Sequence, residues 1–181
     1  MRVVGGELGG RRFAAPRGVA TRPTSERIRE ALFAILGPID GACVLDLFAG
    51  SGALGIEALS RGAARATFVE SASGALAAID RNLSSLGVQE RARVVRADAR
   101  AALRNAAAHG DKYDLVFLDP PYAQARAFGP ELTRALPGLL RPAARVLSES
   151  DRREPLALDL PLTLERRYGD TLIRIHQNSD T

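Results

Sequence analysis

The residues best suited to chemistry in this sequence are Asp119-Pro120-Pro121-Tyr122, which directly follow an apolar run. Proline fixes its own φ and disfavours helical backbone in the residue before it, so the two prolines hold Asp119 and Pro120 extended. The Asp119 carboxylate and the Pro120 carbonyl then form two fixed hydrogen-bond acceptors. Because an exocyclic amine of a nucleobase has two N–H donors, the two acceptors match it one to one.

Two acceptors on one amine indicate group transfer to its nitrogen. They pull the nitrogen toward a tetrahedral form and aim its lone pair at an activated methyl donor, so that positioning replaces a nucleophile or a metal. Tyr122 supplies a ring on which the base would stack, worth about 1–3 kcal/mol, with Pro121 beside it on the substrate side. A base inside a duplex is out of reach, so we expect a flipped or unpaired target. The quartet predicts methylation of a base amine, with Asp119, Pro120 and Tyr122 as catalytic residues and no metal.

A second pattern, Gly50-Ser51-Gly52, lies between an apolar strand and a helix. Glycine lets the backbone turn sharply and approach a ligand, and the start of the helix offers free N–H groups. Acidic residues also end three successive strands, where open α/β sheets bind ligands. These acidic residues are Asp46, Glu70 and Asp98. The pattern indicates a nucleoside cofactor, with Glu70 accepting from both ribose hydroxyls and Asp98 facing an adenine amine.

This arrangement resembles the class I S-adenosylmethionine methyltransferases. The resemblance implies that residues 46–52 hold the methionine part of the cofactor, Glu70 its ribose and Asp98 its adenine. The residues expected to hold the methionine part are Asp46, Phe48, Gly50, Ser51 and Gly52. An NAD site stays open as an alternative, because residues 50–55 also fit the dinucleotide glycine spacing.

Strands and helices alternate along the chain. Strands are predicted at residues 43–48, 66–70, 93–97, 115–119 and 145–150, and helices at 53–61, 74–86, 101–108 and about 128–139, after a first helix that begins at Thr24 or Ser25. This alternation predicts parallel strands joined by crossovers. Runs at 163–168 and 171–176, joined by Gly169-Asp170, predict an antiparallel hairpin. We therefore expect an α/β, Rossmann-like fold with a seven-stranded, mostly parallel sheet that ends in this hairpin.

The excess positive charge lies at the N-terminus. Residues 1–25 hold five arginines and one glutamate, so 5 − 1 = +4, which equals the net charge of the whole chain. Short runs between glycine pairs predict a small hairpin on an extended arm. We expect residues 1–24 to be a basic arm that binds a polyanion, and residues 25–181 to be the catalytic domain. The arginines of the arm are Arg2, Arg11, Arg12, Arg17 and Arg22; Arg126 is either a further phosphate contact or a solvated loop charge.

Nearly the whole chain resembles the bacterial RsmD family. The resemblance rests on the arginine-rich start, on segments 21–24 (Thr-Arg-Pro-Thr) and 29–33 (Arg-Glu-Ala-Leu-Phe), on the glycine-rich turn and on the quartet. It implies methylation of N2 of one guanine in 16S rRNA, with residues 22–30, Thr24 among them, closing over the cofactor. Only about one helix separates Tyr122 from the fifth strand, which favours an RNA target presented by shape over DNA read in a groove.

Two other functions stay open at this point. One is adenine-N6 methylation of DNA or RNA, because the quartet suits any exocyclic amine; the other is a non-catalytic RNA-binding or assembly factor. The single Cys43, which we expect to be a buried thiol, and the lack of a secretion signal or a long apolar run favour a cytoplasmic protein. We expect a monomer that acts on 16S rRNA or on a small ribosomal subunit particle.

Overall fold

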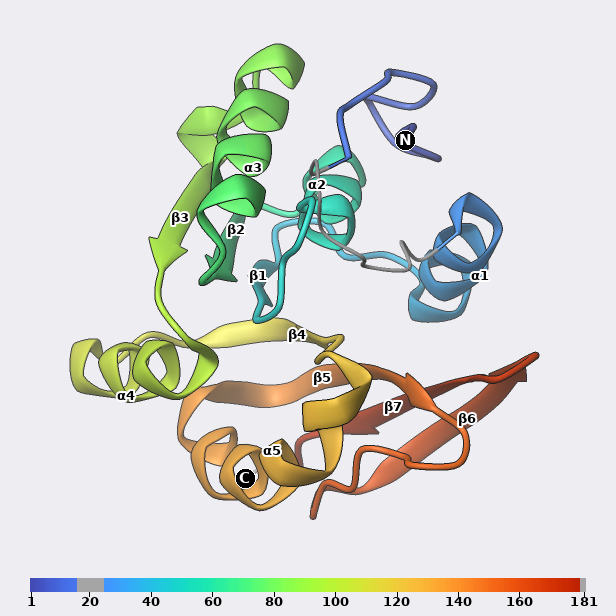
Figure 1. Cartoon of the computed structure of the whole chain (residues 1–181), viewed down its shortest axis with the longest axis vertical. Coiled ribbons are helices and arrows are strands. Elements are labelled where there is room, and N and C mark those ends of the chain that lie inside the picture. The colour runs from blue at the N-terminus through green and yellow to red at the C-terminus, as the bar shows by residue number, and fades with distance from the viewer. Residues whose placement is uncertain (16–24, 180–181) are drawn as a thin grey trace.

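The molecule is built on one seven-stranded sheet with the strand order β3-β2-β1-β4-β5-β7-β6 (Figure 1). The computed structural model describes residues 1–15 and 25–179, and for residues 122–126 it describes the backbone alone. The strands are β1 (Cys43–Asp46), β2 (Arg65–Glu70), β3 (Ala92–Arg96), β4 (Tyr113–Leu118), β5 (Leu140–Asp151), β6 (Leu162–Tyr168) and β7 (Thr171–Gln177). Strands β1 to β5 run parallel, whereas β7 is antiparallel to both β5 and β6. The predicted sheet with its C-terminal hairpin is confirmed.

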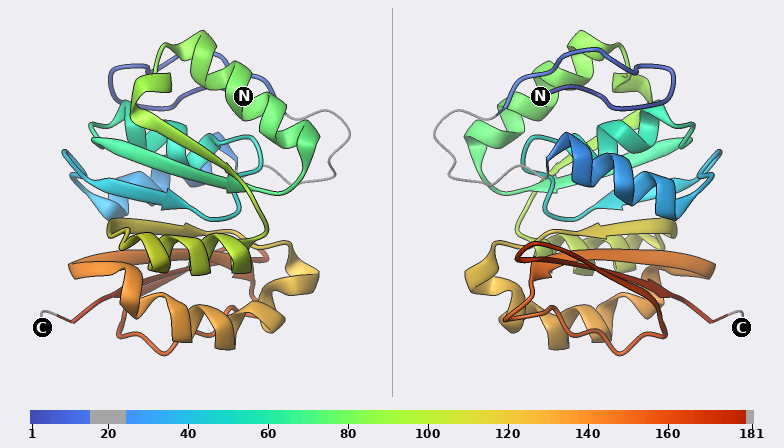
Figure 2. Two further views of the ribbon diagram at one scale, coloured as in Figure 1. Left: turned by 90° about the vertical axis from the view of Figure 1, so that its left-hand side faces the viewer. Right: turned by 90° about the vertical axis from the view of Figure 1, so that its right-hand side faces the viewer.

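Helices cover both faces of the sheet (Figures 1 and 2). They are α1 (Glu26–Leu36), α2 (Ala53–Ser60), α3 (Ser73–Leu86), α4 (Ala99–His109) and α5 (Tyr122–Ala135), with short 3-10 turns η1 (Gln89–Arg91) and η2 (Pro137–Leu139). One apolar cluster joins α1, α2 and α3 to the sheet, and a second joins α4 and α5 to the other face. Because the parallel strands are covered on both sides, runs such as β4 are apolar almost throughout. Over the described residues, no helix is long and apolar enough to cross a bilayer.

Two elements differ from the sequence prediction. Helix α5 begins at Tyr122 rather than near residue 128, and it carries Pro130 inside the helix. A start near 128 would place that proline in the first turn, where it is best tolerated. Strand β5 begins at Leu140, five residues earlier than predicted, because its pairing with β4 shifts register near Ala143, which has a φ of 58°. Cys43 is half-buried rather than buried, because it is the first residue of β1.

The first fifteen residues form a hairpin that packs on the α1–α3 side of the molecule. An antiparallel bridge pairs Arg2 with Arg12, and the Val3 N–H donates to the Arg11 carbonyl at 2.9 Å. The apolar side chains of this N-terminal hairpin (residues 1–15) are buried in the same cluster as those of α1 to α3; they are Val3, Leu8 and Phe13. The predicted hairpin is therefore present, and it shares the main core. The boundary expected at residue 24 lies outside the described residues.

Candidate active site

The glycine-rich turn between β1 and α2 has a backbone that favours glycine. Gly50 has a φ of 54° and Gly52 a φ of 80°, in the left-handed region where a Cβ is strained. The Gly52 N–H closes the turn by donating to the Ala49 carbonyl at 2.7 Å. Gly52 is also the N-cap of α2 and has no side chain to cap it; in the first turn of α2 the Gly55 N–H has a side-chain acceptor in Asp46. The turn and the start of α2 bring backbone N–H groups to this edge, and their predicted role in holding an anionic group stays a prediction.

Asp46, at the end of β1, is bonded to the first turn of α2, which follows the glycine-rich turn. Its Oδ2 accepts the Gly55 N–H at 3.1 Å, and only 2% of the residue surface is exposed. A Cβ on Gly55 would lie 2.3 Å from the Phe68 ring, so glycine lets α2 approach β2 closely. Burial raises the pKa of Asp46 to about 7, the Gly55 hydrogen bond opposes that rise, and Glu70 adds to it. In this conformation Asp46 contacts the first turn of α2 rather than open solvent.

Glu70, at the end of β2, holds the same turn from the side. Its Oε2 accepts the Gly50 N–H at 2.9 Å, and its Oε1 accepts the N–H groups of Ser71 and Ala72 at 2.7 and 2.8 Å. A carboxylate offers about four acceptor positions, so about one remains at Oε2. The expected bonds of Glu70 to both ribose hydroxyls stay a prediction; in the conformation seen here, about one acceptor position is open.

Asp98 follows β3 and caps helix α4. Its Oδ1 accepts the Ala101 N–H at 2.9 Å, and this hydrogen bond is the main cause of the lowered pKa of Asp98. The residue is exposed at the edge of the sheet where Asp46 and Glu70 also end their strands. Oδ1 of Asp98 already accepts a bond from the helix, so Oδ2 is the oxygen left for a ligand. The contact of Asp98 with adenine stays a prediction.

The quartet directly follows β4. Asp119 is partly exposed and Pro120 is buried. Pro121 is the N-cap of α5, with φ −52° and ψ 132°, so the backbone at Pro121 is extended; the extended form of Asp119 and Pro120 stays a prediction. Tyr122 is the first residue of α5, and its side chain and that of Arg126 lie outside what is described. Burial raises the pKa of Asp119 well above its usual value, and the carboxylates of Glu149 and Asp46 raise it further.

The cofactor loop and the quartet lie on neighbouring strands. Strand β1 pairs with β4 along Val44 to Asp46, and the Leu47 N–H donates to the Phe117 carbonyl at 3.2 Å. Leu47, the first residue after β1, is therefore bonded to a residue of β4 that lies two positions before Asp119. Sheet topology, rather than any single contact, brings the acidic strand ends and the quartet to one edge.

Two residues that the sequence did not mark connect the N-terminal hairpin to this edge. The Asn82 amide, buried on α3, exchanges hydrogen bonds of 2.8 and 2.9 Å with the backbone of Ala14 and donates to the Ser51 carbonyl at 3.1 Å. Glu57 on α2 accepts the N–H groups of Val4 and Gly5, each at 2.8 Å. These partners are more than 30 residues apart in sequence, and no local pattern signals them.

The arginines expected to bind RNA have different surroundings. Arg2 pairs with Glu26 at 3.0 Å, and Arg11 donates to the carbonyls of Ser85 and Leu86 at the end of α3. Arg12 is exposed, and among the described residues it makes no ion pair. Arg17, Arg22 and Thr24 lie outside the described residues. Within the hairpin, Arg12 is therefore the arginine best placed for a phosphate.

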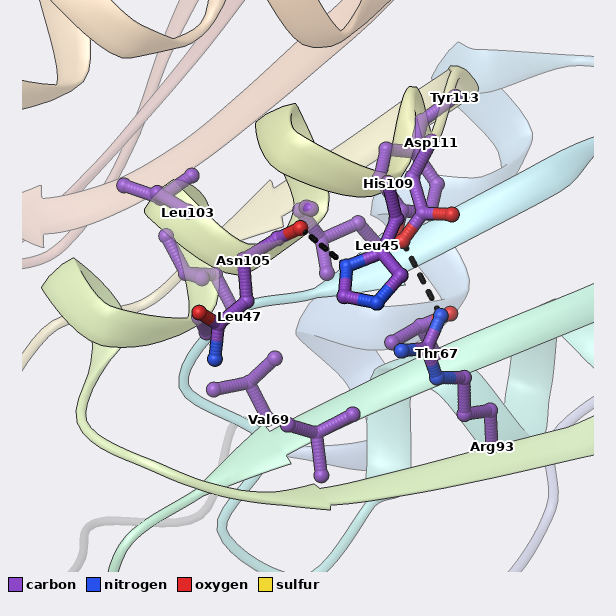
Figure 3. Close-up of a pocket in the computed structure, with 13 residues that line it drawn as sticks. Leu45, Leu47, Thr67, Val69, Arg93, Leu103, Asn105, His109, Asp111 and Tyr113 are labelled. Atoms are coloured by element: carbon purple, nitrogen blue, oxygen red, sulfur yellow. Dashed lines mark hydrogen bonds and ion pairs between the residues drawn. The ribbon is translucent and has the colours of Figure 1, made fainter.

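A separate pocket lies between α4 and the sheet (Figure 3). Its floor is apolar and comes from β1, β2 and β3, and its rim carries the Arg93–Asp111 ion pair of 3.1 Å. His109 Nδ1 lies 2.6 Å from the Asn105 carbonyl, so this nitrogen donates. The lining includes none of Asp46, Glu70 and Asp119, and the pocket is thus distinct from the edge described above.

Solved structures share this fold. The Escherichia coli protein yhhF is 36% identical, with a TM-score of 0.86, and the match covers 100% of this chain and 99% of that one. An RNA methyltransferase from Salinibacter ruber, solved with S-adenosyl-L-homocysteine, is 17% identical, with a TM-score of 0.67 over 88% of this chain and 95% of that one. The fold together with the glycine-rich turn, Glu70 and the quartet defines an S-adenosylmethionine-dependent methyltransferase.

Comparisons of sequence place the chain in one family within this class. The model of the family described as "Conserved hypothetical protein 95" matches residues 1–177, and the chain belongs to this family. Ribosomal RNA small subunit methyltransferase D of Haemophilus influenzae is 33% identical over 182 residues, which cover 98% of this chain and 94% of that protein. YlbH of Bacillus subtilis, a candidate rRNA methyltransferase by its name, is 38% identical over 181 residues, 98% of each chain. The family resemblance inferred from the sequence is confirmed.

Proposed function

We propose that this protein transfers a methyl group from S-adenosylmethionine to the exocyclic N2 amine of one guanine in 16S rRNA. The observation that supports the proposal is the place of Asp119 and Pro120, which directly follow β4, the strand that pairs with β1 and its glycine-rich turn. The methyltransferase D relatives act, by their name, on small-subunit ribosomal RNA, which supports this substrate.

The residues present suit the cofactor. Gly50, Ser51 and Gly52 would hold its methionine part, because they precede the N-terminus of α2, where the N-cap Gly52 has no side chain and N–H groups can face a carboxylate. Glu70 would accept one ribose hydroxyl at Oε2, and Asp98 would lie at the adenine. Phe48 contacts Phe128 edge to face, with ring centroids 5.1 Å apart, and this pair would form an apolar side of the site. Asp46 would act through Gly55 rather than directly.

The chain's own residues would perform the rest of the reaction. When bound, S-adenosylmethionine supplies a sulfonium methyl that needs no further activation. Asp119 and the Pro120 carbonyl accept the two amine N–H groups and direct the nitrogen lone pair. Tyr122 stacks on the base, and Pro121 forms the adjoining surface at the start of α5. Asp119 is also placed to take the amine proton after transfer, since its pKa is raised.

RNA would be held mainly by charge. Arg12 is exposed for a phosphate contact, Arg2 and Arg11 add positive potential from their paired positions, and Arg17, Arg22 and Arg126 complete the proposed set. Residues 1–24 would serve as this basic segment and residues 25–181 as the catalytic domain. We further propose that the protein acts as a cytoplasmic monomer on an assembled small subunit, where one unpaired base is presented by shape.

The test is methyl transfer to small ribosomal subunits that lack the modification, with labelled donor and nucleoside analysis of the product. We expect label on N2-methylguanosine at a single position. Label only on N6-methyladenosine would replace guanine by adenine, and no label with intact cofactor binding would favour a non-catalytic RNA-binding role. The same assay on naked 16S rRNA separates the two forms of substrate.

A further inference from the structure

Asn82, on α3, lies at the junction between the N-terminal hairpin and the glycine-rich turn. Only 1% of its surface is exposed. Its Oδ1 accepts the Ala14 N–H at 2.8 Å, and its Nδ2 donates to the Ala14 carbonyl at 2.9 Å and to the Ser51 carbonyl at 3.1 Å. A side-chain amide has one carbonyl and two N–H donors, so the carbonyl and both donors are used. This buried amide is satisfied by two distant segments of the chain and joins them.

The same contacts fix which way the Asn82 amide faces. Its nitrogen lies against two carbonyl oxygens, and its oxygen lies against one N–H group. The opposite orientation would set oxygen against two oxygens and nitrogen against an N–H group, so hydrogen bonding selects the one seen. Aspartate has the same shape, but as a carboxylate it offers acceptors and no donor. The surroundings of Asn82 therefore distinguish an amide from a carboxylate of equal size.

The peptide units of the glycine-rich turn are held by separate partners. The Gly50 N–H donates to a carboxylate oxygen at the end of β2 at 2.9 Å, and the Gly52 N–H donates to the Ala49 carbonyl at 2.7 Å. Asn82 bonds the carbonyl of the Ser51–Gly52 unit, so this unit is held at both ends. Within the described part of the chain, the Ser51 N–H makes no hydrogen bond. The Ser51 N–H is thus a donor open to a ligand, and the held units on either side set its direction.

The N-terminal hairpin is docked by contacts that do not involve the turn. It lies along α3, where Arg11 donates to two carbonyls at the end of the helix (Figure 2). On α2, the Ser60 hydroxyl accepts a backbone N–H of the hairpin at 3.0 Å, and Glu57 accepts two more at 2.8 Å. The hairpin therefore has a fixed position relative to α2 and α3, and the amide on α3 connects that position to the turn.

We propose that Asn82 is a positioning residue through which the N-terminal hairpin holds the cofactor turn in its binding geometry. It acts through the Ser51 carbonyl rather than on the cofactor itself. The inference rests on the proposed function, in which residues 50–52 hold the methionine part. Without the amide, the Ser51–Gly52 unit loses the bond at its carbonyl, and the Ser51 N–H is no longer held in one direction. The hairpin that carries Arg12 is then also a support of the cofactor site.

Asn82→Asp tests this role, because it keeps the size and the acceptor for the Ala14 N–H and removes both donors. Calorimetry on the full chain measures the Kd of S-adenosylhomocysteine. We expect the Kd to rise about tenfold or more, because a buried carbonyl is left without its donor. In methylation of small subunits, the KM for S-adenosylmethionine should rise while kcat at saturating cofactor is retained, since ground-state and transition-state binding are lost equally. Asn82→Ala, which adds no charge, should change the Kd in the same direction. A Kd equal to that of the parent in the folded variants would overturn the inference.

Ser60→Ala is the matched control for these variants. It removes a buried hydroxyl that joins the hairpin to α2 and that is bonded to Gly5 and Leu8 rather than to the turn. Its melting temperature should fall, as that of Asn82→Asp should, but it should keep the Kd of the parent, because Asn82 still holds the turn. A purely structural role for Asn82 would lower the melting temperature of both variants and raise the Kd of neither, and that result would contradict the proposed role.

Hydrogen exchange on the parent protein decides the question even if no Asn82 variant folds. The Ala14 N–H is bonded to Asn82, so its exchange reports opening of this contact. If opening disrupts the cofactor turn, S-adenosylhomocysteine at about 100 times its Kd should slow this exchange, by up to about 100-fold. The Asp159 N–H, bonded to the Thr133 hydroxyl near the end of α5, is the control and should not change.

Two outcomes separate this inference from the proposed function. Equal exchange of the Ala14 N–H in the free and the ligand-bound parent would overturn the inference alone. Failure of the parent to bind S-adenosylhomocysteine would contradict the proposed function itself.

Discussion

Glu57 and Asp119 are both acids set against the core, but their neighbours have opposite charge. Glu57 is fully buried and accepts from Arg29, Arg61 and two backbone N–H groups, so the acceptor positions of its carboxylate are occupied. Asp119 lies beside two other carboxylates, and its pKa is raised. An acid that is compensated by its own chain holds the fold together, whereas an acid with a raised pKa is suited to proton transfer at a reaction centre.

The largest effect on stability should follow from breaking the compensated site. Glu57→Ala leaves Arg29 buried and charged and removes the acceptor for the N-terminal hairpin, so we expect a loss of about 3–5 kcal/mol of unfolding free energy. Denaturant titration followed by circular dichroism measures it. Glu131→Ala, which removes an exposed pair with Arg100, is the matched control and should cost less than about 1 kcal/mol. Equal losses of unfolding free energy in Glu57→Ala and Glu131→Ala would contradict the structural role given to Glu57.

Removal of a charge among the acids near Asp119 should raise the unfolding free energy, whereas removal of Glu57 lowers it. The pKa of Asp46 is about 7 in the folded protein and 3.8 as a model value, so the stability that this group contributes below about pH 4 is lost as the pH rises through 7. Asp46→Asn keeps an acceptor for Gly55 but carries no charge. We therefore expect it to raise stability near pH 8 by a few kcal/mol, at most about 4, and to have little effect near pH 4.

Asp98 provides the matched control for this pH dependence. Its pKa is lowered by the helix-cap hydrogen bond, so Asp98→Asn should reduce stability at neutral pH and have less effect at acid pH, where the carboxylate is protonated. Thermal melts from pH 4 to 8 compare the variants. If the melting temperatures of Asp46→Asn and of the parent change with pH in parallel, ionisation of Asp46 does not destabilise the fold.

The smallest effect on stability, with a clear effect on binding, is expected for the exposed cation of the hairpin. Arg12→Ala should change the unfolding free energy by less than about 0.5 kcal/mol, yet lower the slope of log affinity for RNA against log salt by about 1. Arg141→Ala, at the amino end of β5 and paired with Asp114, is the control and should keep the slope. An unchanged slope for Arg12→Ala would exclude a phosphate contact there.

Much of the fold could be predicted because its signals are local. Alternating apolar runs and helical periods identified the crossovers, and acidic residues at strand ends placed Asp46, Glu70 and Asp98 at one edge before any contact was known. Strand polarity alone dictates that edge. The start of α5 was placed too late, because Pro130 is best tolerated in the first turn of a helix and so favours a start near residue 128.

The residues that the sequence did not reveal depend on long-range contacts. Asn82 reads as an ordinary polar residue of an amphipathic helix, and its bonds to Ala14 and Ser51 exist only after three segments assemble. Glu149 lies within a strand pattern, and only the β4–β5 register brings it beside Asp119. The hairpin of the basic arm was expected, but not that burial of Val3, Leu8 and Phe13 packs it into the main core.

The central claim is that Asp119 positions and deprotonates a base amine, and Asp119→Ala tests it most directly. Parent and variant are compared in labelled methyl transfer to small subunits that lack the modification, with cofactor binding and melting temperature measured on the same samples. We predict a fall in kcat of about 100-fold or more with the fold and cofactor binding retained, because a preorganised acceptor is lost. Methylation by Asp119→Ala at the rate of the parent would contradict the account.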